Sequence, residues 1–580
     1  VKGKGFSGGL STNKGQYAAG HGPGGGRPVA PNYMCGAAHG GAGNFGNTGV
    51  LFTNTYGSAT APLDPGSGGQ AGYESNQVSS HGGGAVRIVA DQVTVSGTIN
   101  ANASVIPTYF GHASGGSGGG ISITCRTITG TNGVISANGA NAYWTPDIYG
   151  GGGGGGRIAV VYDSAAQGAL PVPSLKFSAA PGMSSYGRLR YYGLAEIGTL
   201  YFPDTTFFSP TNLFDGQWVG PLPASLDLSD WVVSNVWCRL GGLTLTVTNA
   251  LEVVGTNYSR NKLEFTNEAS IECGQLRISG ATFGLARGET EGAVLVCQGG
   301  LTMTNAGALD VTRSNQARFH VEAGLACDGG GADEGARVQV GGDLVVSTNC
   351  WIFPSAHPTN GAVPMFSMHN ITVHPGGGIN ADAAGYMGGL TNSIAYGPGA
   401  GIYSHGASYG GRGTVGYYST NVSPADPYGA SNAPVAPGSG APNGSVTTIR
   451  GPSGGGSIQL RAADTATVRG VLSADGGIGA TYYGGGASGR AIYLTCKTYI
   501  GDSQTVLRAN GGNGDYVLKY ENNYGGAGGG GRIAVWRIND LSPEPSSASV
   551  AGGAWYRPSL GTNYAESGTI VWGWLPSAGT

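Results

Sequence analysis

Two nearly identical stretches decide the architecture of this chain: Tyr149–Val160 reads YGGGGGGGRIAV, and Tyr524–Val535 reads YGGAGGGGRIAV. In both, a Tyr, a run of small residues and an Arg stand directly before an apolar segment typical of a buried strand. A flexible linker is free to drift in length and composition, whereas this segment keeps both. The glycine runs are therefore expected to be ordered structure rather than tethers.

The matching runs belong to an internal duplication. Upstream of them, YGSATAPLDPGSGGQAG at Tyr56–Gly72 corresponds to YGASNAPVAPGSGAPNG at Tyr428–Gly444, at an offset of 372 positions. Downstream, GTLYF from Gly198 corresponds to GTIVW from Gly568. Repeats within one chain are typical of solenoid proteins, so the duplication indicates stacked structural units.

The repeats divide the chain into three parts: a Gly-rich β-solenoid module at 1–204, a central β-helix-like region at 205–378, and a second copy of the module at 379–580. The central region contains short segments with period-2 alternation that end at Gly, Asn or Asp, such as LTLTVTNALEVVG and RVQVGGDLVVSTN. No stretch shows sustained helical spacing. We predict an all-β fold, a parallel β-helix or solenoid with ordered Gly-rich extended segments and nearly no α-helix; a series of β-sandwiches is the competing interpretation.

The glycine segments are interpreted as connections between successive rungs of the solenoid. Glycine lets backbones approach without Cβ contacts, and glycine runs can form threefold extended helices like polyproline II that pack side by side. We expect Arg157 and Arg532, which close the two runs, to donate hydrogen bonds to the carbonyls of the glycine segments. An ordered but irregular loop is the alternative.

Composition excludes several functional classes. Glycine accounts for 113 of 580 residues, charged residues make up only 11%, and the formal net charge is −3. Such a chain lacks the basic character of a nucleic-acid binder, and its low charge with 40% hydrophobic residues argues against disorder. It contains no apolar run long enough for a transmembrane helix. It also begins at Val without a signal peptide, which suggests a processed or excised polypeptide.

The ordered series of motifs resembles the glycine-rich repeats of very large secreted bacterial surface proteins. The resemblance rests on GKGFSGG, GHGPGGG, AAHGGAG, SGGGISITC and GTLYF in the first module, together with the segments quoted above. The central region resembles the β-helical passenger regions of autotransporter-type adhesins. This resemblance implies an extracellular or cell-surface protein with a structural or adhesive role, and it carries no catalytic residues with it.

The usual signatures of cofactor, metal and thiol chemistry are absent from the sequence. There is no phosphate-binding G-x-x-x-x-G-K-[ST] and no H-E-x-x-H, and the eight Cys form no C-x-x-C pair. DGGGADEG at Asp328–Gly335 gathers three carboxylates, but it lacks calcium-loop spacing and is interpreted as a solvated turn. Cys125 and Cys496 close matching strands and are expected to be buried core residues, while disulfides among the five central Cys stay open. We predict no catalytic, cofactor-binding or metal site and no cofactor.

Parallel β-helices also host polysaccharide lyases and hydrolases, which need paired carboxylates or a base beside a neutralising cation. The carboxylates of the central region, Glu264 and Glu322 among them, show no cluster with basic partners at rung spacing. We therefore expect no enzyme. Carbohydrate binding without catalysis is more plausible, since 29 Tyr and 9 Trp supply stacking faces.

Each end of the chain resembles half of a junction that occurs intact inside it. An open solenoid end exposes strand edges and core, and contacts that do not close produce filaments. The sequence thus predicts a structural subunit of an extracellular fibre or cell-surface layer that assembles head to tail with itself. The alternatives are a secreted polysaccharide-binding or polysaccharide-cleaving β-helix and an excerpt of a giant adhesin.

Overall fold

The structure is a computed structural model. It describes these residues: 1–13, 16–27, 34–44, 55–72, 77–105, 113–143, 149–186, 194–211, 213–257, 259–288, 290–305, 316–331, 333–390, 394–417, 422–444, 450–479, 483–515, 524–557 and 561–576.

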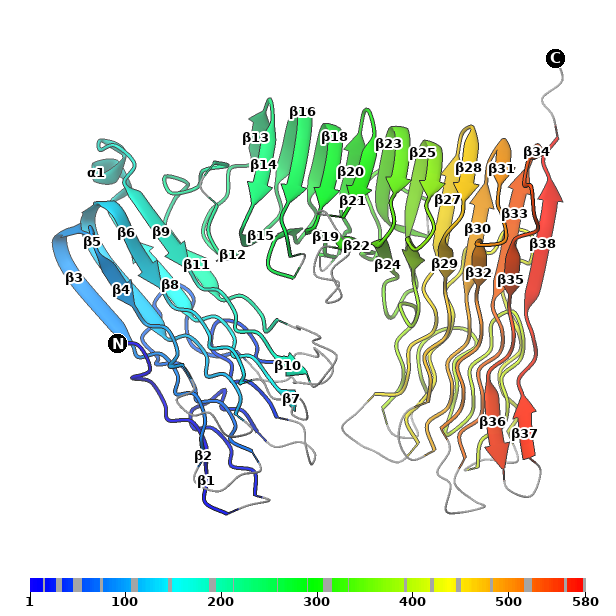
Figure 1. Cartoon of the computed structure of the whole chain (residues 1–580), viewed down its shortest axis with the longest axis horizontal. Coiled ribbons are helices and arrows are strands. Elements are labelled where there is room, and N and C mark those ends of the chain that lie inside the picture. Colours follow the sequence, from blue (N-terminus) through cyan, green and yellow to red (C-terminus); the bar gives the residue numbers. More distant parts are fainter. Residues whose placement is uncertain are drawn as a thin grey trace.

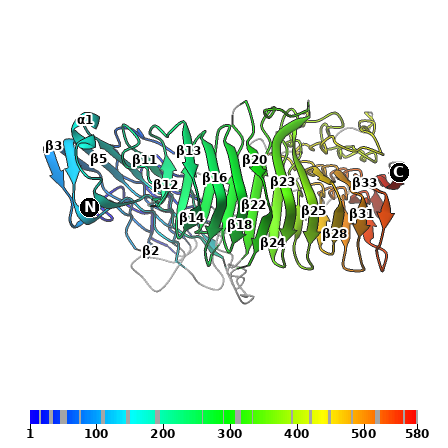
Figure 2. The same cartoon turned by 90° about the horizontal axis from the view of Figure 1, so that it is seen from above.

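A parallel sheet of 14 strands runs from the first module to the second, and a parallel sheet of 15 strands begins in the central region and continues to the carboxy-terminal end (Figures 1 and 2). The 14-stranded sheet consists, in spatial order, of β3 (Val86–Thr94), β5 (Gly120–Thr129), β8 (Arg157–Val161), β11 (Thr199–Tyr201), β12 (Gly216–Trp218), β15 (Trp237–Leu240), β17 (Lys262–Phe265), β19 (Thr282–Leu285), β22 (Ala317–Glu322), β24 (Cys350–Ser355), β26 (Gly378–Asn380), β29 (Val471–Ser473), β32 (Val506–Arg508) and β35 (Ser547–Ser549).

The 15-stranded sheet has a main path of ten strands: β13 (Ser225–Leu228), β16 (Thr244–Val254), β18 (Ser270–Ser279), β20 (Val294–Cys297), β23 (Glu334–Val346), β25 (Val363–Val373), β27 (Ile458–Ala462), β30 (Ala491–Thr495), β33 (Arg532–Arg537) and β38 (Thr569–Trp574). Five further strands pair beside this path: β14 (Trp231–Ser234), β21 (Leu301–Thr304), β28 (Thr465–Val468), β31 (Thr498–Ile500) and β34 (Asn539–Asp540).

The remaining elements are small. A three-stranded parallel sheet joins β4 (Thr98–Asn100), β6 (Thr131–Ser136) and β9 (Ser174–Ser178), and three antiparallel pairs join β1 (Leu10–Ser11) to β2 (Gln77–Val78), β7 (Tyr149–Gly150) to β10 (Ser185–Tyr186), and β36 (Ala554–Arg557) to β37 (Gly561–Tyr564). The one helix among the described residues is α1 (Ser164–Gly168), whose first turn is capped by the Asp163 carboxylate accepting from the Ala166 N–H at 2.9 Å.

Parallel pairing in register stacks apolar side chains into files that run along the axis of the solenoid. One file in the 15-stranded sheet is buried throughout and passes through Leu245, Ile271, Leu295, Val338, Phe366, Leu460, Leu494 and Val535. Because side chains alternate between the two faces of a strand, every second residue enters this core and the others face outward. The predicted all-β parallel solenoid with almost no helix is confirmed.

The glycine runs lie inside bundles of extended segments, and their hydrogen bonds repeat every third residue. Successive N–H groups of the first run turn toward three neighbouring segments, each time to a backbone carbonyl: Gly153 to Ala140, Gly154 to Ala37, Gly155 to Glu196 and Gly156 to Ala137. The second run repeats the pattern, with one segment accepting from every third residue: Gly525 to Asp515, Gly528 to Gly512 and Gly531 to Ala509. A hydrogen-bond direction that repeats every third residue is that of a polyproline II helix, which has three residues per turn.

Glycine is required at the centre of the bundle by distance alone. A Cβ placed on Gly154 would lie 2.0 Å from the carbonyl oxygen of Gly41, far inside van der Waals contact. At such positions the runs keep glycine because a larger side chain would separate segments that hydrogen-bond to each other, whereas the second run accommodates a buried Ala at position 527. Figure 1 shows both bundles extending from the same side of the central strands.

The arginines that close the runs fasten the bundles to the sheets. In both copies the guanidinium donates through Nε to the carbonyl of the Tyr that opens the upstream repeat segment, and through Nη1 to a Thr hydroxyl on the next strand. Arg157 donates to Tyr56 (2.8 Å) and Thr199 (3.2 Å). Arg532 donates to Tyr428 (3.2 Å) and Thr569 (2.9 Å). The expectation that they donate to the glycine runs themselves is wrong, because the run carbonyls accept from backbone N–H groups of neighbouring segments, as Gly153 does from Gly182 and Gly154 from Gly118.

The two copies of the module join the solenoid through opposite sheets. The RIAV strand of the first copy, β8, belongs to the 14-stranded sheet, whereas the matching strand of the second copy, β33, belongs to the 15-stranded sheet. β8 pairs with β11 and β33 pairs with β38, so each copy keeps its own internal pairing. The copies are therefore related by more than a translation along the axis.

Candidate functional site

The outward face of the 14-stranded sheet carries an unusual group of polar and aromatic side chains in the central region. On β15, β17 and β22 every second residue faces outward, and pairing in register places these residues in two rows. The first row contains Trp237, Lys262, Thr282, Arg318 and Trp351, and the second contains Arg239, Glu264, Gly284, His320 and Phe353.

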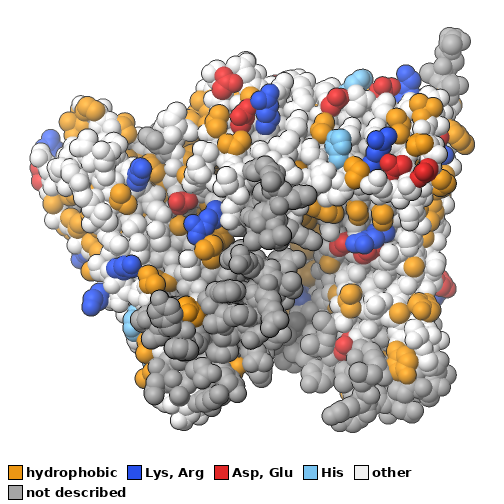
Figure 3. All heavy atoms as spheres, viewed as in Figure 1, with side chains coloured by type: hydrophobic (Ala, Val, Ile, Leu, Met, Phe, Trp, Pro, Cys, Tyr) orange, Lys and Arg blue, Asp and Glu red, His pale blue; other side chains and the backbone are white. Residues whose placement is uncertain are grey.

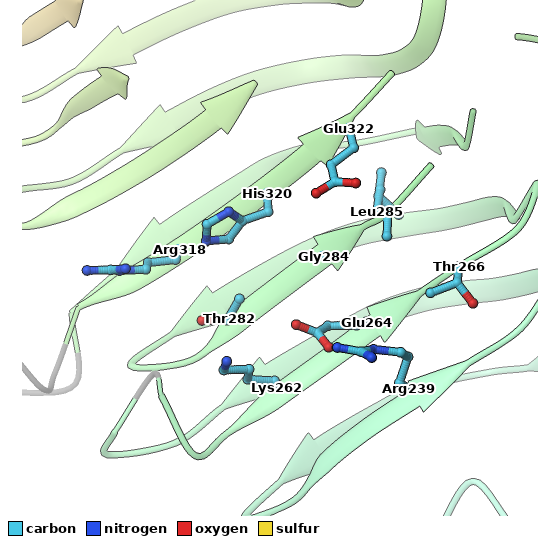
Figure 4. Close-up of a pocket in the computed structure, with 11 residues that line it drawn as sticks. Arg239, Lys262, Glu264, Thr266, Thr282, Gly284, Leu285, Arg318, His320 and Glu322 are labelled. Carbon is cyan, nitrogen blue, oxygen red and sulfur yellow. The ribbon is translucent and has the colours of Figure 1, made fainter. Parts of the chain in front are cut away.

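A pocket of about 430 Å³ opens over these rows between β17 and β22 (Figure 4). Its floor is β19, whose outward residues Thr282 and Gly284 are smaller than their neighbours on either side. A Cβ on Gly284 would come within 3.1 Å of the Glu264 Cγ. The hollow thus exists because β19 presents only Thr282 and Gly284 on its outward face, between strands with larger side chains.

Glu264 and Arg239 form the most firmly held part of the pocket. One Glu264 carboxylate oxygen accepts from the Trp237 indole Nε1 at 2.8 Å and from the Arg239 Nε at 3.1 Å, and Arg239 Nη1 pairs with Glu196 at 2.8 Å. Burial raises the pKa of Glu264, but the charges of Lys262 and Arg239 and these hydrogen bonds outweigh it, so the pKa lies below its usual value. Glu264 is therefore a fixed anion and unsuited to give up a proton as a general acid.

Lys262 is held against an aromatic ring rather than against an acid. Its Nζ lies 3.6 Å from the centroid of the Trp237 ring, and it makes no ion pair within 4.0 Å among the described residues. Burial, together with the nearby charges of Arg239 and Arg318, lowers the pKa of Lys262 to about 8 against the opposing effect of Glu264. The ammonium is still mostly protonated at neutral pH.

Arg318 and His320 form the opposite wall on β22. Arg318 receives support from the Gln316 side-chain oxygen, which accepts from Nη2 at 3.0 Å, and its guanidinium lies 5.4 Å from the Phe353 ring centroid. The His320 ring stacks on Phe353 with centroids 4.7 Å apart and planes at 13°. Burial and the charges of Arg318 and Lys262 lower the pKa of His320 to about 3, so the imidazole is neutral at pH 7.

The pocket has two chemically different ends. Lys262 and Arg318 lie at one end with Thr282 between them, and Glu322 lies toward the other, beyond His320 (Figure 4). Arg239 is engaged by Glu196 and Glu264, so the cationic character is concentrated at the Lys262 and Arg318 end. The arrangement is suited to recognising an anion that also carries neutral polar groups.

The sequence analysis did not predict this cluster. It predicted no site and no grouping of the central carboxylates with basic partners. The residues of one row lie 25, 20 and 36 positions apart along the chain, from Trp237 through Lys262 and Thr282 to Arg318. Rungs of unequal length hide the register. A usable signal was the alternation of charged and apolar residues in KLEF at 262–265 and RFHVE at 318–322.

Other residues singled out in the sequence have structural surroundings. Cys125 and Cys496 are buried in the main core, as predicted. Of the three carboxylates in DGGGADEG, Glu334 is the first residue of β23 and lies 3.8 Å from Arg337. The described part of the chain holds no group of three or more His, Cys, Asp or Glu side chains arranged to bind a metal ion.

A search of the described residues for membrane-spanning helices and comparisons of the chain with known proteins gave no match. Among the residues that the structure describes, no helix is long and apolar enough to cross a membrane. No protein-family model, curated protein or solved structure matches the chain.

Proposed function

We propose that the protein is a structural subunit of an extracellular fibre or cell-surface layer and that its copies stack end to end. The observation that carries the proposal is that the files of core side chains run to both ends of the described solenoid and are only partly covered there. Between the two ends, the sheets and the glycine bundles form one continuous body. The resemblance to secreted surface proteins supports an extracellular location. On the face in Figure 3, charged side chains lie singly or in small groups of mixed sign, which fits a passive scaffold.

At the amino-terminal end, the outermost strand is β3. It pairs with β5 and with no other strand in the described part of the chain. Its inward residues Val86 and Ile88 lie in register with the fully buried Ile121 and Ile123, but they are themselves only partly buried. Val89, on the outward face of the same strand, is 66% exposed.

The carboxy-terminal end shows the same feature on the other sheet. Ile570 and Trp572 of β38 continue the files of the fully buried Ile533 and Val535, yet they are 39% and 36% exposed. Further along the strand, Trp574 is 59% exposed. A strand edge with uncovered apolar side chains is a surface on which another strand can pair, and pairing of β38 with β3 of the next copy would extend the stack.

The test is negative-stain electron microscopy of the purified protein over a dilution series, with two matched variants. Ile570→Lys places a charge in the proposed contact, and Val232→Lys places the same charge on an exposed position of β14 in the middle of the solenoid. We expect long fibres with a regular axial repeat for the wild type and Val232→Lys, and short rods for Ile570→Lys. Short rods in all three samples, or fibres in all three, would contradict stacking through this end.

A further inference from the structure

We propose that the pocket between β17 and β22 binds an acidic sugar unit of a polysaccharide, with the sugar carboxylate held at Lys262 and Arg318 and its hydroxyl groups directed toward Glu322. The site is built by the central region alone. It therefore stands or falls independently of end-to-end stacking.

The cationic end matches one carboxylate. Lys262 and Arg318 occupy the same row on strands separated by β19, so they lie on either side of the Thr282 hydroxyl, about two strand spacings or ~10 Å apart across the sheet. The structure holds Lys262 Nζ over the Trp237 ring and the Arg318 guanidinium 5.4 Å from the Phe353 ring centroid, so both side chains turn inward when they bind a carboxylate over Thr282. Each can then donate a charge-assisted hydrogen bond, which is stronger than a bond between neutral groups. Lys262 makes no ion pair within 4.0 Å among the described residues, and Glu264 acts on it only from a greater distance, so a ligand anion can become its direct partner.

The remaining walls limit the ligand to one negative group. Glu264 is a permanent anion and Glu322 stands at the far end, so a second acidic group on the ligand would meet like charge. Ligand hydroxyls can instead donate to the Glu322 carboxylate or bond to the Thr266 hydroxyl, which also lines the pocket. One carboxylate surrounded by hydroxyls is the chemistry of a sugar acid, whereas a polyphosphate or nucleic acid would carry repulsive charge into the acidic end.

The shape of the pocket fits a flat ring. His320 stacks face to face on Phe353 of the next strand, so its other face is directed toward β19, over Gly284. A neutral imidazole in this position offers a planar wall for a pyranose ring, and Gly284 leaves the floor open beneath it. The volume of about 430 Å³ lies within the ordinary range of small-ligand pockets, roughly 300–1,000 Å³.

The experiment is isothermal titration calorimetry of the intact protein at pH 7 with trigalacturonate, and with the uncharged galactotriose as the matched neutral probe. Two variants change different walls: Lys262→Met removes the charge and keeps the side-chain length, and Gly284→Val fills the floor. Lys176→Met, at an exposed position on β9, is the control for loss of a lysine. Circular dichroism of each variant establishes that the fold is retained.

We expect trigalacturonate to bind and galactotriose to bind at least about tenfold more weakly. Lys262→Met should weaken trigalacturonate binding about ten- to hundredfold, as for loss of a charge-assisted hydrogen bond, and Gly284→Val should weaken it similarly. Lys176→Met should bind like the wild type. Absence of trigalacturonate binding, equal binding of the two probes, or equal affinities of the Lys262→Met and Lys176→Met variants would overturn the proposal.

Discussion

Replacing Gly154 with Ala tests whether the glycine bundle is a packed structure. The new Cβ would start 2.0 Å from the Gly41 oxygen and 2.5 Å from its carbonyl carbon, whereas ordinary contacts begin at 3.4 Å. The two segments must therefore move apart by more than 1 Å at the centre of the bundle. That movement disrupts the bond from the Gly154 N–H to Ala37 (2.8 Å) and the bond from the Gly118 N–H to Gly154 (3.0 Å).

The size of the effect follows from these two bonds. A buried backbone group left without a partner costs about 1–3 kcal/mol, so we expect Gly154→Ala to lower the free energy of unfolding by about 2–6 kcal/mol. Gly97→Ala is the matched control, because a Cβ at Gly97 would have no atom within 4 Å. It should change stability by less than about 1 kcal/mol, in the stabilising direction.

The assay is urea unfolding followed by circular dichroism, with limited proteolysis to locate the weakened part. Gly154→Ala should lower the urea midpoint and admit protease into the first module, while Gly97→Ala should behave like the wild type. Equal midpoints and equal digestion for the two variants would refute the packed bundle and favour an ordered loop with room for side chains.

Two further predictions concern thiols and pH. All eight cysteines are buried and free, so a thiol reagent should modify essentially none in the folded protein and eight after unfolding; fewer after unfolding would mean that Cys273 and Cys297, whose Sγ atoms lie 3.4 Å apart, had joined. Burial and neighbouring cations lower the pKa of His320 to about 3 from an unfolded value of 6.5, so the unfolded chain takes up this proton first as the pH falls. The free energy of unfolding should therefore decrease between these pH values by up to about 1.4 kcal/mol per unit, and His320→Gln should reduce that slope in urea titrations; an unchanged slope would contradict it.

The solenoid was predictable because its signals are local. Period-2 alternation in segments such as LTLTVTNALEVVG identifies strands without knowledge of their partners, and the repeated glycine run before Arg157 and Arg532 indicates a packed connection. The targets of those arginines were not predictable, since they depend on a turn about a hundred residues upstream. The pocket was hidden for a related reason: Lys262 and Arg318 become neighbours across β19 only through the register of rungs of different length.

The sequence also could not predict that the two copies enter different sheets. β8 and β33 carry the same RIAV motif and each pairs within its own module. Which large sheet they enter is determined by how the central strands connect to them. Local similarity therefore fixes the module and leaves its placement in the solenoid to long-range pairing.

The glycine bundles have a thermal consequence that separates them from the sheets. The core of the β-helix is one continuous apolar cluster of large side chains. The separate apolar cluster among the described residues of the second bundle consists of Ala407, Ala441 and Ala487. Exposing apolar surface raises the heat capacity on unfolding, while exposing peptide groups lowers it. A body held together mainly by peptide hydrogen bonds thus has a flatter stability curve with temperature. On cooling, when the hydrophobic contribution weakens, the bundles keep more of their stability than the β-helix that joins them.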